Sequence, residues 1–376
     1  MPYYLADHAV LKWLERPSVY HLKHDELYEL DDTSFAFLNT CLSDAGGATN
    51  DSAFVDYCRE EGILTTTKAL RNNPPVIRAP EPSLRYLELQ VTNACNLRCK
   101  HCYIGDGPVR ELSAEQVRVV LEEFEEMQGL RVMITGGEPL LHSEFQTINA
   151  LFADAAVRTT LFTNGLLLSD HVLKGLNVHE IQVSIDGLEQ AHDSIRGRGS
   201  YKQAIDALQR SLDAGFDTSI ATMVHPGNRG DFETMEGMFK NMGIKDWTVD
   251  IPCETGRLKN NNDFHLTPEE GGTYLAYGYG GGLHSTGTGY ACGLHLMAVM
   301  ADGRAAKCTF YGDDAAGTID EGLPACWSRI RPLKLGTLQC DCDYREECRG
   351  GCRYRAELLD GAGGKDLYRC ALYGIV

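Results

Sequence analysis

The sequence lacks the features that would place a protein across a membrane or on a nucleic acid. None of its apolar runs approaches the roughly 18 residues that a membrane span needs, and its first residues lack the basic and then apolar order of a signal peptide. Acidic residues outnumber basic ones, 53 to 35, and no basic cluster offsets the net charge of -18, which repels a phosphate backbone. These absences predict a cytoplasmic protein without a membrane or nucleic-acid partner.

Cysteine, in contrast, is abundant and unevenly spread. Of the 14 cysteines, three lie between positions 95 and 102, and eight lie between positions 292 and 370. Cys41, Cys58 and Cys253 stand alone, and we expect Cys41 and Cys58 to be small buried apolar side chains. Without a secretory signal, so many cysteines favour metal or redox chemistry over disulfides.

The first cysteine group has the spacing Cys95-x3-Cys99-x2-Cys102 and follows a strand-like stretch, residues 86–91. A four-iron cluster takes four thiolates, so a loop with three leaves one iron free for a ligand that is not protein. The alternatives are a structural zinc site or three unrelated thiols. Zinc sites usually join paired C-x2-C knuckles, and no fourth ligand lies nearby in the sequence.

The Cys95–Cys102 spacing resembles that of the radical S-adenosylmethionine (SAM) family. In that family the open iron is chelated by the amino and carboxylate groups of SAM. Tyr103 fits the resemblance as well, because the family usually has an aromatic residue beside the third thiol. The resemblance implies reductive cleavage of SAM to a 5'-deoxyadenosyl radical, which abstracts hydrogen from an unactivated carbon.

Residues 1–82 are predicted to form a separate module with a proline-rich linker. Two short strands, residues 18–22 and 26–30, are followed by helices that begin near Asp32 and Asn50. The order resembles the winged-helix peptide-recognition element of ribosomal-peptide maturases. A generic dimerisation or packing module is the alternative.

The linker spans residues 72–82, where four prolines within nine residues cannot continue a helix or a central strand.

Strands and helices alternate through the second segment, residues 83–285. Six apolar strands with helices between them predict an α/β fold, a partial (β/α)6 barrel with its site at the carboxyl ends of the strands. The strands are expected at residues 86–91, 131–134, 159–163, 180–185, 218–224 and 247–251, and the helices near Ser113, Ser143, Ser169, Tyr201 and Asp231.

Polar and glycine residues follow several of these strands. By resemblance, Gly136, Gly137, Glu138 and Pro139 bind the SAM amino group, a role for which glycines allow close approach and a carboxylate offers an acceptor. The ribose and carboxylate of SAM are expected at Asn164, Ser184, Asp186 and Arg196. Asp186 has an alternative role as the cap of the next helix, and Arg196 has one as a surface residue.

The third segment, residues 286–376, resembles the SPASM extension of radical SAM enzymes, in which seven cysteines hold two auxiliary iron-sulfur clusters. The resemblance assigns Cys292, Cys308 and Cys352 to the first cluster, and Cys340, Cys342, Cys348 and Cys370 to the second. One departure is plain, because the family has C-x2-C where this chain has Cys340-x-Cys342. The fourth ligand of the first cluster stays open among Cys326, Cys253, a non-cysteine group and the substrate.

The expected protein is therefore a radical SAM/SPASM enzyme with three 4Fe-4S clusters and SAM. Its implied partners are a precursor peptide, whose leader the N-terminal module binds, and a reductant such as flavodoxin or ferredoxin. The product would be a peptide with a thioether or carbon-carbon crosslink. The alternative to a peptide substrate is a small molecule such as a tetrapyrrole. The alternative to an enzyme is an iron-sulfur scaffold or electron carrier. The sequence identifies no catalytic acid or base.

Overall fold

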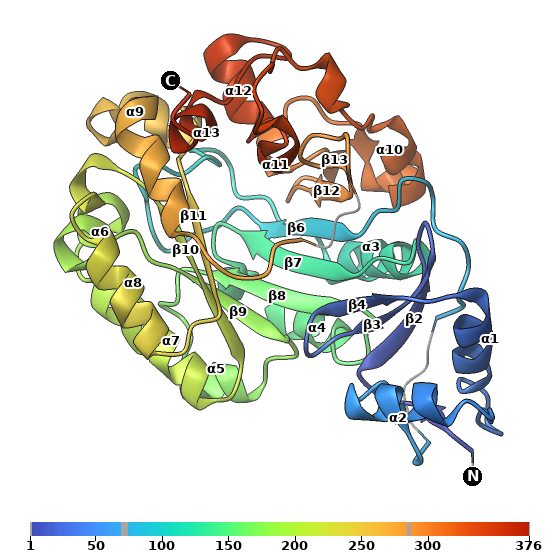
Figure 1. Ribbon diagram of the computed structural model, residues 1–376. Coiled ribbons are helices and arrows are strands. Elements are labelled where there is room, and N and C mark those ends of the chain that lie inside the picture. Colours follow the sequence, from blue (N-terminus) through green and yellow to red (C-terminus); the bar gives the residue numbers. More distant parts are fainter. Residues whose placement is uncertain (1, 69–73, 284–286, 376) are drawn as a thin grey trace.

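The structure is a computed structural model that describes residues 2–68, 74–283 and 287–375. Its centre is a mostly parallel sheet (Figure 1), so the predicted α/β fold is confirmed. Six parallel strands lie in sequence order, and all six predicted strands are confirmed to within two residues at either end. They are β6 (Tyr86–Thr92), β7 (Arg131–Gly136), β8 (Arg158–Thr163), β9 (Glu180–Ser184), β10 (Asp217–Met223) and β11 (Asp246–Asp250).

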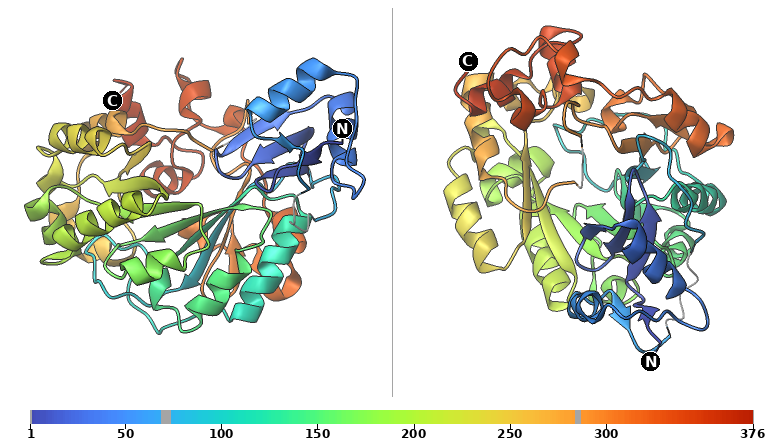
Figure 2. Two further views of the ribbon diagram at one scale, coloured as in Figure 1. Left: turned by 90° about the horizontal axis from the view of Figure 1, so that it is seen from below. Right: turned by 45° about the vertical axis from the view of Figure 1, so that its right-hand side comes forward.

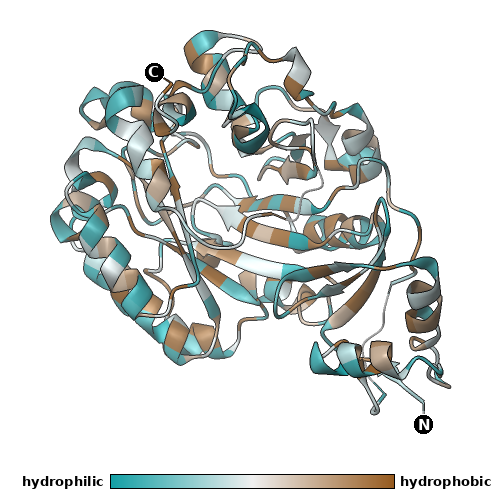
Figure 3. Ribbon diagram, viewed as in Figure 1, coloured by the Kyte–Doolittle hydropathy of each residue, from teal (hydrophilic) through white to brown (hydrophobic). Residues whose placement is uncertain are grey.

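Helices between these strands cover the outer face of the curved sheet (Figure 2). They are α3 (Ala114–Glu126), α4 (Phe145–Leu151), α5 (Asp170–Lys174), α6 (Glu189–Arg196), α7 (Ser200–Asp213) and α8 (Phe232–Asn241). Ser113 and Ser169 cap α3 and α5 as predicted, each accepting a backbone N–H of the first turn. Helix α6 was not predicted. Apolar residues gather on the strands and polar ones on the outward sides of the helices (Figure 3).

The third segment extends the central sheet beyond β6. Strand β12 (Leu296–Val299) pairs in parallel with β6, and β13 (Arg304–Ala306) and β14 (Gly317–Thr318) continue the sheet with antiparallel pairing. Short helices α9 (Pro268–Gly271), α10 (Leu323–Arg329), α11 (Arg345–Cys348), α12 (Arg353–Asp360) and α13 (Leu367–Leu372) follow or flank these strands. The cysteine-rich region is thereby fixed beside the first strand of the core.

The N-terminal module contains a three-stranded antiparallel sheet in the order β2-β3-β4. Strands β3 (Pro17–His21) and β4 (Glu26–Glu29) match the two predicted strands, and β2 (Ala9–Trp13) is an additional one. Helices α1 (Asp32–Thr40) and α2 (Ser52–Glu60) pack beside the sheet, and β1 (Tyr4–Leu5) pairs with β5 (Leu64–Thr65). Cys41 and Cys58 are buried in this small core, as expected.

The described part of the linker is tied to the module, since the Ala79 N–H donates to the Trp13 carbonyl at 2.7 Å. Linker residues 72 and 73 lie outside the described residues. Across the ranges that the structure describes, no helix combines the length and the apolar character that crossing a membrane requires.

Candidate functional site

A cavity of about 330 Å³ lies at the carboxyl ends of the parallel strands. We call it the loop cavity, because the Cys95–Cys102 loop forms one wall. All three loop cysteines line it, together with six of the residues predicted to contact SAM: Tyr103, Gly136, Gly137, Asn164, Ser184 and Arg196. Residues from all six parallel strands and the loop therefore converge on one space, as expected for the carboxyl edge of a parallel sheet.

The three loop thiols lie close enough to affect one another electrostatically. Burial raises the pKa of Cys95 and Cys99, that of Cys99 to about 11, and neighbouring thiols raise both further. Arg196 opposes this shift at both sulfurs. In the described ranges, no three Cys, His, Asp or Glu side chains approach as closely as the ligands of a single metal ion. Three soft sulfur donors around a cavity fit a larger iron-sulfur cluster.

The two glycines at the end of β7, Gly136 and Gly137, are required by the chain that leads into the cysteine loop. A Cβ on Gly136 would lie 2.2 Å from the Thr92 carbonyl oxygen, and one on Gly137 would lie 2.3 Å from that of Ala94. The Gly137 N–H donates to the Thr92 carbonyl at 2.9 Å. Any side chain here would push the loop away from the sheet, so these glycines set the position of the thiols.

Glu138 is fully buried and does not line the loop cavity. Its carboxylate accepts hydrogen bonds from the Thr163 hydroxyl at 2.9 Å and from the Asn164 N–H at 2.9 Å. Burial raises its pKa to about 7, although these donors oppose the shift. Glu138 thus holds the end of β8 in place, with Pro139 buried beside it.

Asp186 and Arg196 form a buried ion pair in which Arg196 lines the loop cavity and Asp186 lies behind it. The Arg196 Nε donates to the Asp186 carboxylate at 2.5 Å, and the Met223 N–H donates at 2.7 Å. Burial alone would raise the pKa of Asp186, but Arg196 and two nearby histidines hold it well below its usual range. The capping alternative is wrong, because Leu188 occupies the N-cap of α6. Arg196 is not a surface residue, since its side chain is 11% exposed.

His101 is a cavity residue that the sequence analysis missed. Its ring lines the loop cavity between the second and third loop thiols, and its Nε2 lies 3.6 Å from the Asp186 carboxylate. Its Nδ1 is buried and has no hydrogen-bond partner among the residues that the structure describes. Burial lowers its pKa to about 4, which leaves the ring neutral near pH 7. The sequence signal that could have identified His101 is its position between Cys99 and Cys102 in the cysteine motif.

A second cavity, of about 470 Å³, lies in the third segment, and we call it the cysteine-rich cavity. Cys292, Cys308 and Cys352 line it, and each is within electrostatic reach of another. The buried Cys253 lies beside Cys352, because its thiol hydrogen-bonds the Cys352 sulfur and thereby lowers the pKa of Cys352 to about 7. Arg355 ties the two segments together, with Nη1 donating to the Ile251 carbonyl at 3.0 Å.

The four other predicted SPASM ligands are close enough to influence one another, and one of them, Cys348, also lines the cysteine-rich cavity. Cys370 is influenced by Cys340, Cys342 and Cys348, and burial with these thiols raises its pKa to about 11. Cys326 lies apart from both groups. It is fully buried, and its thiol donates to the Thr318 carbonyl at 3.3 Å. Burial raises the pKa of Cys326, and the negative charge of Glu321 raises it further.

Comparison with known proteins gives a consistent set of relatives. Residues 89–237 match the sequence family described as the radical SAM superfamily. Mycofactocin maturase MftC of Mycolicibacterium smegmatis is 27% identical over 302 residues, covering 71% of this chain and 77% of the relative. AdoMet-dependent heme synthase of Nitratidesulfovibrio vulgaris is 23% identical over 345 residues, covering 77% of this chain and 93% of the relative.

Among solved structures, Streptococcus suis SuiB bound to precursor peptide SuiA superimposes with a TM-score of 0.69. The match covers 96% of this chain and 98% of the other at 15% identity, so the two proteins share their fold over nearly their whole length.

Proposed function

We propose that the radical SAM domain formed by residues 89–237 works with the flanking segments to modify a ribosomally synthesised precursor peptide. When bound, a four-iron cluster with SAM would supply on reduction a 5'-deoxyadenosyl radical for the abstraction of hydrogen from the peptide. The observation that carries the proposal is the convergence of three loop thiols and Arg196, which the buried Asp186 holds in place, on one cavity. The shared fold with a peptide-bound protein and the similarity to a maturase support a peptide substrate.

In the loop cavity, Cys95, Cys99 and Cys102 would hold the cluster. The guanidinium of Arg196 lines the cavity, and only its Nε is bonded to Asp186 in the described chain, so Nη1 and Nη2 are available to a carboxylate such as that of SAM. Asn164 and Ser184 contribute polar atoms to the same wall. Asp186 and Glu138 act behind this wall as positioning residues for Arg196 and for the end of β8.

The two further cysteine groups would hold auxiliary clusters in the third segment. For the first of them, we infer that Cys253 is the fourth ligand, since it already contacts Cys352. Cys326 is bonded to Thr318 and lies away from both groups. We propose that the enzyme acts in the cytoplasm, with a flavodoxin or ferredoxin as its reductant.

The leader of the peptide would add as a strand to β4, the edge of the N-terminal sheet. The Leu30 N–H donates to the Pro17 carbonyl on β3 at 2.9 Å. Because backbone groups alternate along a strand, the N–H groups of Leu27 and Glu29 face the open edge. A leader bound there would pair with these groups.

The test is turnover of the short peptide encoded beside the gene, followed by mass spectrometry under anaerobic conditions. We expect a loss of hydrogen from the peptide by the wild-type protein. Glu29→Pro removes an edge N–H and should weaken leader binding about tenfold or more, whereas the control Glu29→Ala keeps the N–H and should bind normally. A wild-type protein that ignores the peptide but converts a tetrapyrrole would show that the substrate is a small molecule.

A further inference from the structure

Glu88 stands where three cavities meet. It projects from the inner face of β6 and lines the loop cavity, the cysteine-rich cavity and a third cavity of about 810 Å³. The third cavity and the loop cavity also share Phe162, Gln182 and Thr248. These shared walls indicate one connected interior space with Glu88 at its centre.

The third cavity, which we call the N-terminal-edge cavity, runs along the inner face of the sheet to the start of the strands. The turn between β3 and β4, residues 23–26, forms part of its rim. From Arg158 to Phe162 the path spans four residues of β8, or about 13 Å at the rise of a strand. An extended peptide of about four residues would therefore reach from the rim to the loop cavity.

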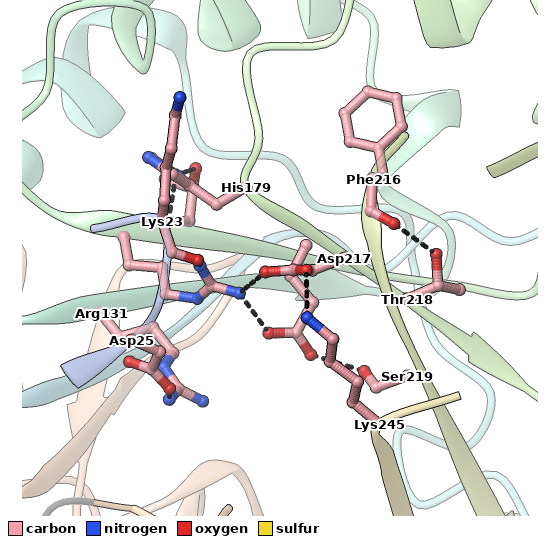
Figure 4. Close-up of polar contacts among 12 residues, drawn as sticks. Lys23, Asp25, Arg131, His179, Phe216, Asp217, Thr218, Ser219 and Lys245 are labelled. Atoms are coloured by element: carbon pink, nitrogen blue, oxygen red, sulfur yellow. Dashed lines mark hydrogen bonds and ion pairs between the residues drawn. The ribbon is translucent and has the colours of Figure 1, made fainter. Parts of the chain in front are cut away.

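Arg158, Arg131 and Lys245 at the rim are already paired with carboxylates. The Arg158 Nη2 donates to Asp217 at 2.9 Å and to Glu180 at 3.1 Å, and Lys245 lies 3.5 Å from Asp217. Figure 4 shows Asp217 and Lys245 pointing toward one another, with Asp25 and Arg131 together nearby. Arg158 also donates to the Leu22 and Lys23 carbonyls, which fixes the turn of the N-terminal module over the rim.

Glu88, deeper inside, has no cationic partner among the described residues. Its carboxylate accepts the Thr309 N–H at 2.9 Å and the Thr309 hydroxyl, and neither group carries charge. Burial raises its pKa, as expected for a carboxylate whose charge is not compensated. Asp246, at the start of β11, lines the same cavity, and burial raises its pKa as well. Glu88 is thus an acidic group of the interior without a cationic partner among the described residues, whereas Arg158 and Lys245 at the rim are each paired with a carboxylate.

We propose that the N-terminal-edge cavity holds the segment of the peptide that is modified, and that the Glu88 carboxylate, at its border with the loop cavity, binds the ammonium or guanidinium group of a Lys or Arg in it. The inference rests on the proposed function and adds a substrate requirement to it. A charge-assisted hydrogen bond to Glu88 would hold the carbon chain of that side chain against the loop cavity. Glu88 would therefore be a specificity-determining residue.

The test is a double-mutant cycle between the enzyme and its peptide. The probe is the leaderless core segment of the peptide encoded beside the gene, labelled with a fluorophore, and each Lys or Arg is replaced in turn by norleucine or citrulline. Binding is measured by anisotropy with the full-length reconstituted protein. Glu88→Gln should weaken binding of the natural segment about tenfold or more. For the one segment whose critical Lys or Arg has been replaced, Glu88→Gln should cause no further loss of binding affinity.

Glu122→Gln, an exposed carboxylate on the outer helix α3, is the control and should change binding less than about twofold. The peptide replacements leave the protein untouched, so they remain informative if Glu88→Gln folds poorly. Additive effects of the two changes, or a modified segment without Lys or Arg, would overturn this inference alone. A wild-type protein that modifies no peptide would overturn the proposed function and this inference with it.

Discussion

Replacing Asp186 by Asn should destabilise the protein and weaken SAM binding together. Asp186 is fully buried and its partner Arg196 is 11% exposed, so the neutral amide would leave a buried guanidinium without its counter-charge. Removing one member of a buried pair costs about 3–5 kcal/mol. For a chain of 376 residues, this corresponds to a fall in melting temperature of about 4–6 °C at an unfolding entropy of about 2.1 cal/mol/K per residue.

The assay is thermal unfolding of the anaerobically purified protein, with SAM binding measured by calorimetry on the same samples. Glu122→Gln breaks an exposed pair with Arg118, whose side chains are 41% and 56% exposed, and should cost no more than about 0.5 kcal/mol. Because the folded-state pKa of Asp186 is depressed, its contribution is present above pH about 4 and fades as the pH falls further. The gap between wild type and Asp186→Asn should therefore narrow in acid. Equal melting temperatures for Asp186→Asn and Glu122→Gln would refute this reasoning.

Three further outcomes follow from the same contacts. Cys253→Ser should reduce the iron content and alter an auxiliary-cluster EPR signal, because Cys253 contacts Cys352. Cys326→Ser changes a buried thiol that bonds Thr318 and should leave the iron content unchanged. Equal iron loss in the two variants would contradict the assignment of Cys253. Gly137→Ala places a Cβ 2.3 Å from the Ala94 carbonyl, so iron bound by the loop should fall while wild-type-like iron in the auxiliary sites remains. In Arg158→Lys, the single ammonium group cannot reach two carboxylates and two carbonyls at once, so amide hydrogen exchange in the β3–β4 turn should increase. Unchanged exchange would show that other contacts hold the turn.

Much of the core could be predicted from the sequence because the parallel strands are short segments with buried apolar residues, separated by helical patterns. Helices α3 and α5 were located by their serine caps. Helix α6 was missed because its buried residues, Ala191, His192 and Ile195, give a weak apolar signal. Strand β12 has only four residues, and its pairing with β6 depends on contacts more than 200 positions apart, which local patterns do not encode.

For the polar residues of the site as well, the sequence gives the position, and the fold is needed to show the contacts. The motif located Glu138, but only the fold shows that its carboxylate bonds Thr163 and Asn164 and does not line the cavity. Glu88 had a local signal, because a carboxylate in the apolar strand β6 has to face either a partner or a cavity. Deciding between these two requires the positions of β12 and of the Cys308–Thr309 segment, which come from the third segment of the chain.

The central claim, that the three loop thiols hold a SAM-cleaving cluster, is tested most directly by measuring iron and 5'-deoxyadenosine after anaerobic reconstitution, with dithionite as the reductant. We expect about 12 iron per wild-type chain if all three clusters have four irons, and 5'-deoxyadenosine formation from SAM. Joint replacement of Cys95, Cys99 and Cys102 by Ala should lower the iron content to about 8 per chain and abolish 5'-deoxyadenosine. Zinc in place of iron, or undiminished 5'-deoxyadenosine formation by the triple variant, would contradict the claim.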